Sequence, residues 1–139
     1  MGYDPNNVFA KILRGEIPSF KVYEDDKTLA FMDVMPQADG HTLVIAKEQA
    51  EDLFSLSPAG AAAMIATTQN VARAVKKALN APGIMVAQLN GAPAGQSVFH
   101  VHFHIIPRSA GVDFKLHARE METPEKLRAM ADKIKAALH

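Results

Sequence analysis

Three histidines recur at every second position in one short segment, His100-Val101-His102-Phe103-His104-Ile105-Ile106. Side chains on a β-strand alternate between its two faces, so this spacing predicts that the three imidazoles share one face. The apolar residues between them, Val101, Phe103 and Ile105, would take the other face and pack on the core. The segment therefore predicts a strand that presents a stripe of imidazoles.

Such a stripe has three interpretations: a polar surface, a metal site or a catalytic centre. Two neighbouring histidines on a strand can chelate zinc. The outer two of the three would be about 13 Å apart on a straight strand, at roughly 3.3 Å per residue, so one ion would not easily bind all three. An imidazole can also attack phosphorus, carry a group and release it, because it titrates near neutrality. We favour this nucleophilic interpretation.

A loop of small and polar residues, Ala94-Gly95-Gln96-Ser97, leads directly into the stripe. Glycine lets a ligand approach the backbone closely, and Gln96, Ser97 and free N–H groups can donate to an anion. The alternative is an ordinary connecting loop. Its position next to the imidazoles favours a binding site for a phosphate group.

The remaining patterns predict the elements that position these residues. A capped short helix is expected over 8–14, a long amphipathic helix over 58–79 and a C-terminal helix from Thr123-Pro124. Strands are expected over 20–24, 29–32, 41–46, 84–89 and 98–106, with Pro107 ending the last. These elements predict an α+β fold, with an antiparallel sheet of about five strands packed with the long central helix and the C-terminal helix. We expect one domain over 1–139.

Composition narrows the function classes. The 139 residues contain 15 Lys plus Arg and 15 Asp plus Glu, so the formal net charge is zero and nonspecific nucleic-acid binding is not expected. The absence of cysteine excludes disulfides, a thiol nucleophile and cysteine-ligated metals. We expect no membrane partner, because the apolar runs are far shorter than the 18 or more residues of a membrane span. A polar N-terminus without a signal peptide suggests a cytoplasmic location.

The stripe resembles the His-φ-His-φ-His-φ-φ motif of the histidine triad family, φ being hydrophobic. Other segments resemble the Hint-like branch of that family in order and spacing, over about residues 6 to 108. They are Val8-Phe9-Ala10-Lys11-Ile12, Gly15-Glu16-Ile17-Pro18, Tyr23-Glu24-Asp25-Asp26, Ala30-Phe31-Met32-Asp33-Val34-Met35-Pro36-Gln37, Gly40-His41-Thr42-Leu43-Val44-Ile45 and Gly95-Gln96-Ser97-Val98-Phe99-His100. The segment after Arg108 resembles bacterial members.

The resemblance implies the catalytic residues. His102 matches the middle histidine, which is the family's nucleophile. His100 and His104 match the flanking histidines, which orient the nucleophile and contact phosphate, and His41 matches an upstream histidine that completes the cluster. The alternative for His41 is an exposed residue at the start of a strand, and we favour the functional interpretation.

The resemblance also implies a purine-nucleotide site in each protomer of a homodimer whose two sheets join. Asp33 matches the ribose-binding acid, although an aspartate before a proline-containing loop could also be a turn former. The residues that match the base pocket are apolar: Val8, Phe9, Ile12, Phe31 and Val34. The phosphate side is matched by Asn90, Gly95, Gln96 and Ser97.

From this resemblance we expect a hydrolase of purine nucleoside phosphoramidates or related α-phosphate derivatives that forms a nucleotidyl-histidine intermediate. No cofactor and no metal are expected, because imidazoles and loop donors can stabilise the charge. Many bacterial relatives hold a structural zinc with cysteines near the N-terminal helix, and this chain has none. The alternatives are a dinucleoside polyphosphate hydrolase or nucleotidyltransferase of the same family, and a non-enzymatic nucleotide-binding or protein-interaction module.

Overall fold

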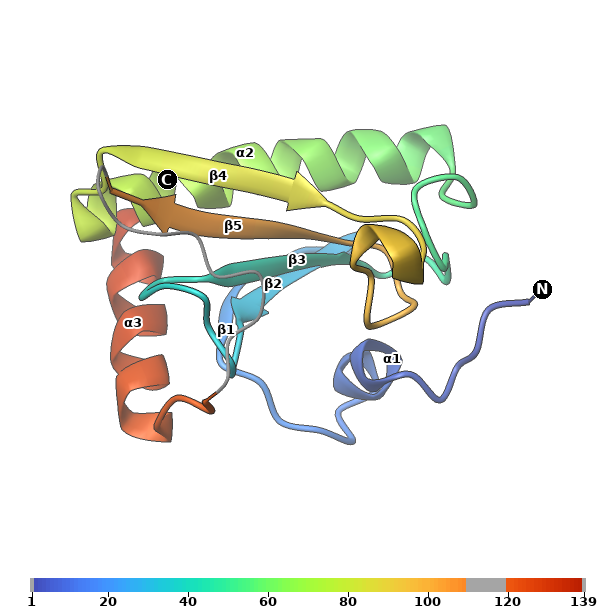
Figure 1. Cartoon of the computed structure of the whole chain (residues 1–139), viewed down its shortest axis with the longest axis horizontal. Coiled ribbons are helices and arrows are strands. Elements are labelled where there is room, and N and C mark those ends of the chain that lie inside the picture. The colour runs from blue at the N-terminus through green and yellow to red at the C-terminus, as the bar shows by residue number, and fades with distance from the viewer. Residues whose placement is uncertain (1, 110–119, 139) are drawn as a thin grey trace.

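The computed structural model describes residues 2–109 and 120–138 and shows the expected α+β fold (Figure 1). Within these residues, one antiparallel sheet of five strands has the order β1-β2-β3-β5-β4. The strands are β1 (Lys21–Glu24), β2 (Thr28–Met32), β3 (Thr42–Ala46), β4 (Gly83–Gln88) and β5 (His102–Arg108). The helices are α1 (Val8–Leu13), α2 (Pro58–Leu79) and α3 (Pro124–Ala137), with a short 3-10 turn, η1 (Ala92–Ala94).

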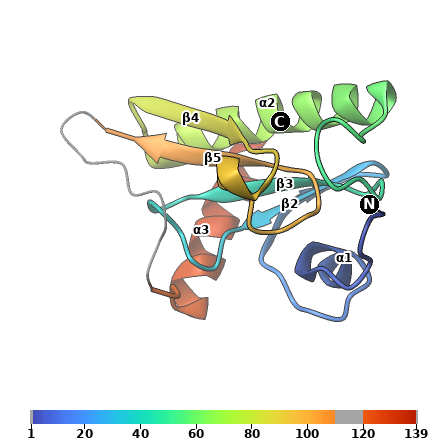
Figure 2. The same ribbon diagram turned by 45° about the vertical axis from the view of Figure 1, so that its right-hand side comes forward.

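The two faces of the sheet carry separate apolar clusters. The larger joins one face of the strands to α2 and α3 and includes Val44, Val71, Ile105 and Ile134. A smaller cluster on the other face lies against α1 and consists of Phe9, Leu29, Phe31, Leu43 and Ile45. Figure 2 shows α1 lying apart from α2 and α3. The histidine stripe shares the face of the smaller cluster, because Leu43 pairs with His104 and Ile45 with His102.

The helices begin and end where their capping residues predict. The side chains of Asn7, Ser57 and Thr123 each accept a hydrogen bond from a backbone N–H in the first turn of their helix. Helix α2 is followed by Asn80 in a left-handed conformation, with φ of 49°. No helix among the described residues is long and apolar enough to cross a bilayer.

Strand β5 differs from the expected 98–106 at both ends. It begins at His102, because its neighbour β3 ends at Ala46 and the backbone N–H of Val101 donates to the carbonyl of Ala50 instead. It continues through Pro107 to Arg108, paired with β4. Pairing with β3 stops at Ile105, so the proline lies where β5 has one neighbour only and its missing N–H is tolerated.

Gly40 closes the loop between β2 and β3, directly before His41. Its φ is 89°, a conformation that residues with a Cβ rarely adopt. A Cβ at this position would also clash with the side chain of Leu79 at the end of α2. Glycine therefore allows the loop to lie against the end of the long helix.

Candidate active site

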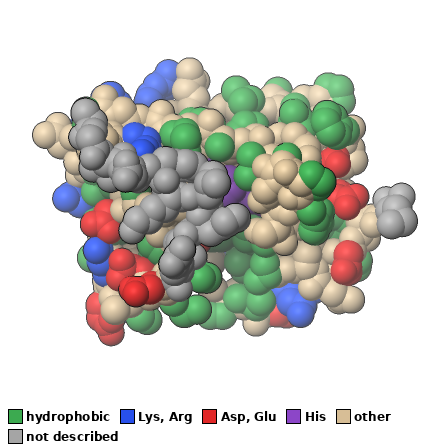
Figure 3. Space-filling model, viewed as in Figure 1, with side chains coloured by type: hydrophobic (Ala, Val, Ile, Leu, Met, Phe, Trp, Pro, Cys, Tyr) green, Lys and Arg blue, Asp and Glu red, His purple; other side chains and the backbone are tan. Residues whose placement is uncertain are grey.

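The structure brings the four predicted histidines together from three segments. His102 and His104 lie on β5, His41 directly precedes β3, and His100 lies in the bend before β5. The ring centroids of His102 and His104 are 5.0 Å apart, and those of His41 and His104 are 5.2 Å apart. Phe9 of α1 lies edge-on to His102, with centroids 4.9 Å apart. Figure 3 shows a histidine side chain at the centre of one face of the molecule.

His100 lies outside the strand, and two hydrogen bonds hold its fully buried ring. Its Nε2 lies 2.6 Å from the carbonyl oxygen of Ala46, and a carbonyl only accepts, so Nε2 carries a proton. Burial lowers the pKa of His100, which makes the neutral ring the stable form. Its Nδ1 therefore accepts the hydrogen bond that the Tyr3 hydroxyl donates at 2.6 Å.

His102 has the protonation that a nucleophile needs. Its Nδ1 lies 2.7 Å from the carbonyl oxygen of His100, so the ring proton is on Nδ1 and a lone pair is on Nε2. No hydrogen bond within the described part of the chain uses Nε2. Burial, with smaller contributions from the neighbouring His104 and His100, lowers the pKa of His102 to about 4. At neutral pH, Nε2 is therefore an unprotonated nitrogen.

In His104 the ring proton is on Nε2, whereas in His102 it is on Nδ1. The backbone N–H of Gln37 donates to His41 Nδ1 over 3.0 Å, so the neutral His41 ring carries its proton on Nε2. That nitrogen lies 3.0 Å from His104 Nδ1, to which it donates, and His104 is left with an N–H at its far nitrogen, Nε2. Burial, with smaller contributions from His104 and His102, lowers the pKa of His41 to about 3. Burial also lowers the pKa of His104.

Asp33 lies beside the hydrogen bond between His41 and His104. One carboxylate oxygen accepts the backbone N–H of Met35, and the other is 3.5 Å from His41 Nε2. Burial raises the pKa of Asp33 to about 6, so the carboxylate is mostly ionised at neutral pH. The contact with His41 is not an ion pair, because the imidazole is neutral. Asp33 therefore keeps acceptor capacity for a ligand.

The same three side chains, Asp33, His41 and His104, are close enough to hold a metal ion, with ligand atoms within 4.8 Å of one another. Their protonation does not fit a metal. The Gln37 N–H occupies His41 Nδ1, so Nε2 bears a proton and has no lone pair to offer. A metal would have to displace that proton and break the hydrogen bond to His104.

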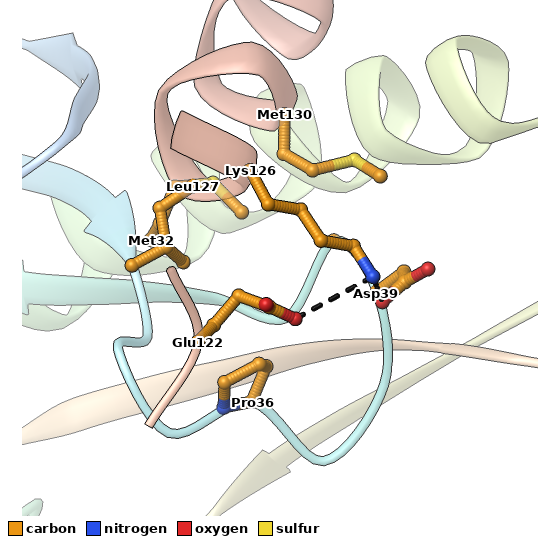
Figure 4. A pocket seen from close by; sticks show the side chains of 8 residues that line it. Met32, Pro36, Asp39, Glu122, Lys126, Leu127 and Met130 are labelled. Carbon is orange, nitrogen blue, oxygen red and sulfur yellow. Dashed lines mark ion pairs between the residues drawn. The ribbon is translucent and has the colours of Figure 1, made fainter. Parts of the chain in front are cut away.

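The loop that carries Asp33 and Gln37 is held from outside by the beginning of α3. The backbone N–H of Glu122 donates to the Val34 carbonyl oxygen. Lys126 of α3 pairs with Asp39 at 2.9 Å and with Glu122 at 3.5 Å (Figure 4). Next to this bridge, Met32, Leu127 and Met130 line a small pocket together with loop residues that include Pro36 and Asp39. The C-terminal helix therefore supports the loop at a distance from the imidazoles.

Three of the residues expected to line a base pocket lie in or against the smaller apolar cluster. Phe9 and Phe31 are buried with ring centroids 5.6 Å apart, and Ile12 packs against them. Val8 and Val34 are exposed and stand outside the cluster. The cluster adjoins His102 through Phe9, so an apolar ligand group near the cluster would lie close to the His102 ring.

The expected phosphate-side residues have different tasks in the structure. Gln96 is buried: its Oε1 accepts the Gly91 N–H, and its Nε2 donates to two backbone carbonyls. The expectation that its amide donates to an anion is therefore not met, because the side chain holds the loop together. Asn90 likewise pairs with Gln88 and accepts the N–H of Leu53. Gly95 has φ of 107°, and Ser97 forms no hydrogen bond within the described part of the chain.

Sequence reasoning missed Tyr3, Gln37 and Ala46. Gln37 and Ala46 act through backbone groups, which leave no signal in the residue type. Tyr3 lies in no periodic pattern. The only signal in the sequence is that Tyr3 is an aromatic residue shortly before the capping asparagine of α1.

Known proteins resemble this chain in sequence and in fold. The HIT domain family matches residues 14–111. The Protein hit of Bacillus subtilis is 40% identical over 134 residues, 93% of this chain and 92% of that protein. Adenylylsulfatase HINT3 of Arabidopsis thaliana is 43% identical over 101 residues, 73% of this chain and 51% of that protein. The crystal structure of a Hit-like protein from Bartonella henselae superposes with a TM-score of 0.93 and 49% identity, covering 99% of this chain and 100% of that chain.

Proposed function

The chain belongs to the HIT domain family, and from that premise we propose that it hydrolyses purine nucleoside phosphoramidates or related α-phosphate derivatives through a covalent nucleotidyl-histidine intermediate. The observation that carries this proposal is the state of His102, a neutral imidazole with its proton held on Nδ1 and a lone pair on Nε2. The relative named an adenylylsulfatase supports a substrate with an adenylyl group.

The reaction has two displacements at the α-phosphorus. In the first, His102 Nε2 forms a bond to phosphorus as the bond to the leaving amine breaks, and the amine departs with a proton from water. The ring then carries the nucleotidyl group and a positive charge, which its Nδ1–H shares with the His100 carbonyl oxygen. In the second, water attacks phosphorus, releases the nucleoside monophosphate and returns one proton to solvent, which restores the neutral imidazole.

The neighbouring groups stabilise charge and hold the nucleoside. The hydrogen bond from His41 fixes the proton of His104 on Nε2. This N–H donates to a non-bridging phosphate oxygen whose negative charge grows in the transition state. Asp33 accepts hydrogen bonds from the two ribose hydroxyls. Phe9, Ile12 and Phe31 contact the faces of the purine, and Ser97 with its loop lies on the phosphate side. An apolar pocket discriminates weakly between adenine and guanine.

A trapping experiment tests the proposal. The protein is mixed with adenosine phosphoramidate, quenched at alkaline pH within milliseconds to seconds, and analysed by intact-protein and peptide mass spectrometry. We expect an adenylyl adduct on His102 together with release of AMP. Nucleotide binding without an adduct or turnover would instead support the non-enzymatic module. The His102→Asn variant is the control, because it keeps a polar side chain and removes the nucleophile.

A kinetic panel separates the proposal from the other enzymes of the family. Adenosine and guanosine phosphoramidates are expected to react with kcat/KM values within about a hundredfold of each other, the range that an apolar pocket can discriminate. A much faster cleavage of diadenosine polyphosphates would identify a dinucleoside polyphosphate hydrolase. Transfer of the nucleotidyl group to an added phosphate acceptor in preference to water would identify a nucleotidyltransferase.

We also propose a twofold-symmetric homodimer. Among residues 2–109 and 120–138, strand β4 is an edge of the sheet, and its Val86 is exposed, as is Ile65 on the neighbouring α2. An unpaired edge strand with apolar side chains is a ready surface for a second copy. Analytical ultracentrifugation at micromolar concentration is expected to give twice the 15.1 kDa of one chain. A species of 15.1 kDa would contradict the dimer.

A further inference from the structure

We propose that Tyr3 is a positioning residue for the nucleophile: its hydroxyl fixes the ring of His100, whose carbonyl holds His102 in its reactive tautomer. The inference deepens the proposed function and rests on it, because it assumes that His102 Nε2 is the attacking atom. Tyr3 touches no reacting atom and acts only through His100.

The need for Tyr3 follows from the position of His100. The ladder of β5 begins at His102, so no strand pairing holds His100 in place. Its fully buried ring has two polar nitrogens, and leaving either unpaired would be costly. The Ala46 carbonyl oxygen satisfies Nε2, and the Tyr3 hydroxyl satisfies Nδ1. The tyrosine ring also lies edge-on to the imidazole, with centroids 5.5 Å apart.

The N-terminal arm, residues 3–7, is anchored well enough to present this hydroxyl. Asp4 accepts the N–H of Asn6 on its side chain, and its carbonyl accepts the side-chain amide of Asn7. Arg14 donates to the carbonyl of Pro5 and so ties the arm to the far end of α1. The same helix carries Phe9, whose ring contacts both His100 and His102. The arm and α1 thus form one support for this pair of histidines.

Removal of the hydroxyl would loosen the nucleophile without touching the nucleotide. With Nδ1 unpaired, the His100 ring can rotate or exchange its tautomer, and either change disturbs the bond to Ala46. The His100 carbonyl then no longer holds the Nδ1–H of His102 in one position. The alternative tautomer of His102 has its proton on Nε2 and cannot attack phosphorus. The effect should therefore fall on kcat and leave KM unchanged.

The test compares Tyr3→Phe with Tyr23→Phe. The first substitution keeps the ring against His100, and the second removes a hydroxyl that donates to Asp25 in the β1–β2 hairpin. With adenosine phosphoramidate, Tyr3→Phe should lower kcat about five- to tenfold at unchanged KM, the size expected for one lost hydrogen bond. Tyr23→Phe should leave both constants unchanged. Thermal denaturation of both variants checks that the loss of rate does not follow a loss of stability.

A second readout does not depend on the substrate. Long-range ¹H–¹⁵N spectra of the ligand-free protein report the tautomer of each imidazole. We expect Tyr3→Phe to shift the Nδ1 signal of His100 and to alter both His102 nitrogens, with His41 unchanged. Unmoved His100 and His102 signals, or a kcat within twofold of the unmutated protein, would overturn the proposal. An unmutated protein that fails to cleave the phosphoramidate would contradict the proposed function alone, and the spectra would still decide the role of Tyr3.

Discussion

Two pairs of histidines meet at the centre of this site, and they are built differently. In one pair, a backbone N–H from Gln37 fixes His41, whose ring then donates directly to the ring of His104. In the other, the Ala46 carbonyl and the Tyr3 hydroxyl fix His100, whose carbonyl then accepts from His102. Each pair places a fully buried histidine behind one on β5.

This difference decides which ring nitrogen carries the proton in His104 and in His102. Because His41 receives a hydrogen bond and passes one on, His104 ends with an N–H at its Nε2. Because a carbonyl holds the Nδ1–H of His102, that ring ends with a lone pair at its Nε2. Two identical side chains, neighbours on one strand face with rings 5.0 Å apart, thus present an N–H and a lone pair at their Nε2 atoms. The hydrogen-bond partners behind them, rather than residue type, set this difference.

The largest effect is expected where the proposed nucleophile, His102, is removed. His102→Asn should lower kcat by more than about 10³-fold, while AMP binding measured by calorimetry stays within about tenfold. His104→Ala removes a donor instead and should cost about 10²-fold in kcat. Equal losses in the two variants would erase the distinction between nucleophile and donor.

A smaller effect is expected one step behind the donor. His41→Asn removes the ring that fixes the proton of His104, which can then carry that proton on either nitrogen. We expect kcat to fall about tenfold at nearly constant KM, since the donor is present but no longer held in one tautomer. Steady-state kinetics with adenosine phosphoramidate measures both constants. A rise in KM with unchanged kcat would place His41 in substrate binding.

The smallest effect concerns Asp33 and depends on pH. Burial raises its pKa to about 6, so its ionised form, the better hydrogen-bond acceptor, dominates above that pH and is lost as the pH falls through it. KM for a ribonucleoside phosphoramidate should therefore rise by up to about tenfold on acidification. The His102 nitrogen stays unprotonated over this range, because its pKa is about 4, and kcat should change little.

Asp33→Asn is the matched control for this pH effect. The variant should have a raised KM that no longer depends on pH near 6. It should also lose the expected preference for ribonucleotides over 2′-deoxyribonucleotides. An unmutated protein that turns over ribo and deoxy substrates equally well would remove Asp33 from the ribose site.

Local signals in the sequence predicted much of this framework. The capping residues located the starts of the helices, and the alternation of Val101 to Ile105 gave the correct faces for β5. The start of β5 could not be predicted, because it depends on where β3 ends, a property of another segment. Gln96 shows the same limit. Its residue type allows anion binding, but in the structure its side-chain amide donates to nearby backbone carbonyls.

The support behind the histidines was hidden for a related reason. Gln37 and Ala46 contribute through the main chain, which every residue has, and neither could be distinguished from its neighbours by type. Tyr3 contributes through its side chain, but its partner His100 is 97 positions away along the chain. Contacts of this kind become visible only when the sheet and the N-terminal arm are folded together.

Gly40 bears on how this protein can change over evolutionary time. A Cβ at position 40 would clash with the tip of the flexible Leu79 side chain, and a smaller residue at position 79 would relieve that clash. The positive φ of Gly40 has no such remedy, since that conformation belongs to the backbone. A smaller residue at position 79 would therefore remove the clash but not the strain at position 40. Because His41 follows directly, any other residue at position 40 would strain the backbone that places His41 and its hydrogen bond to His104.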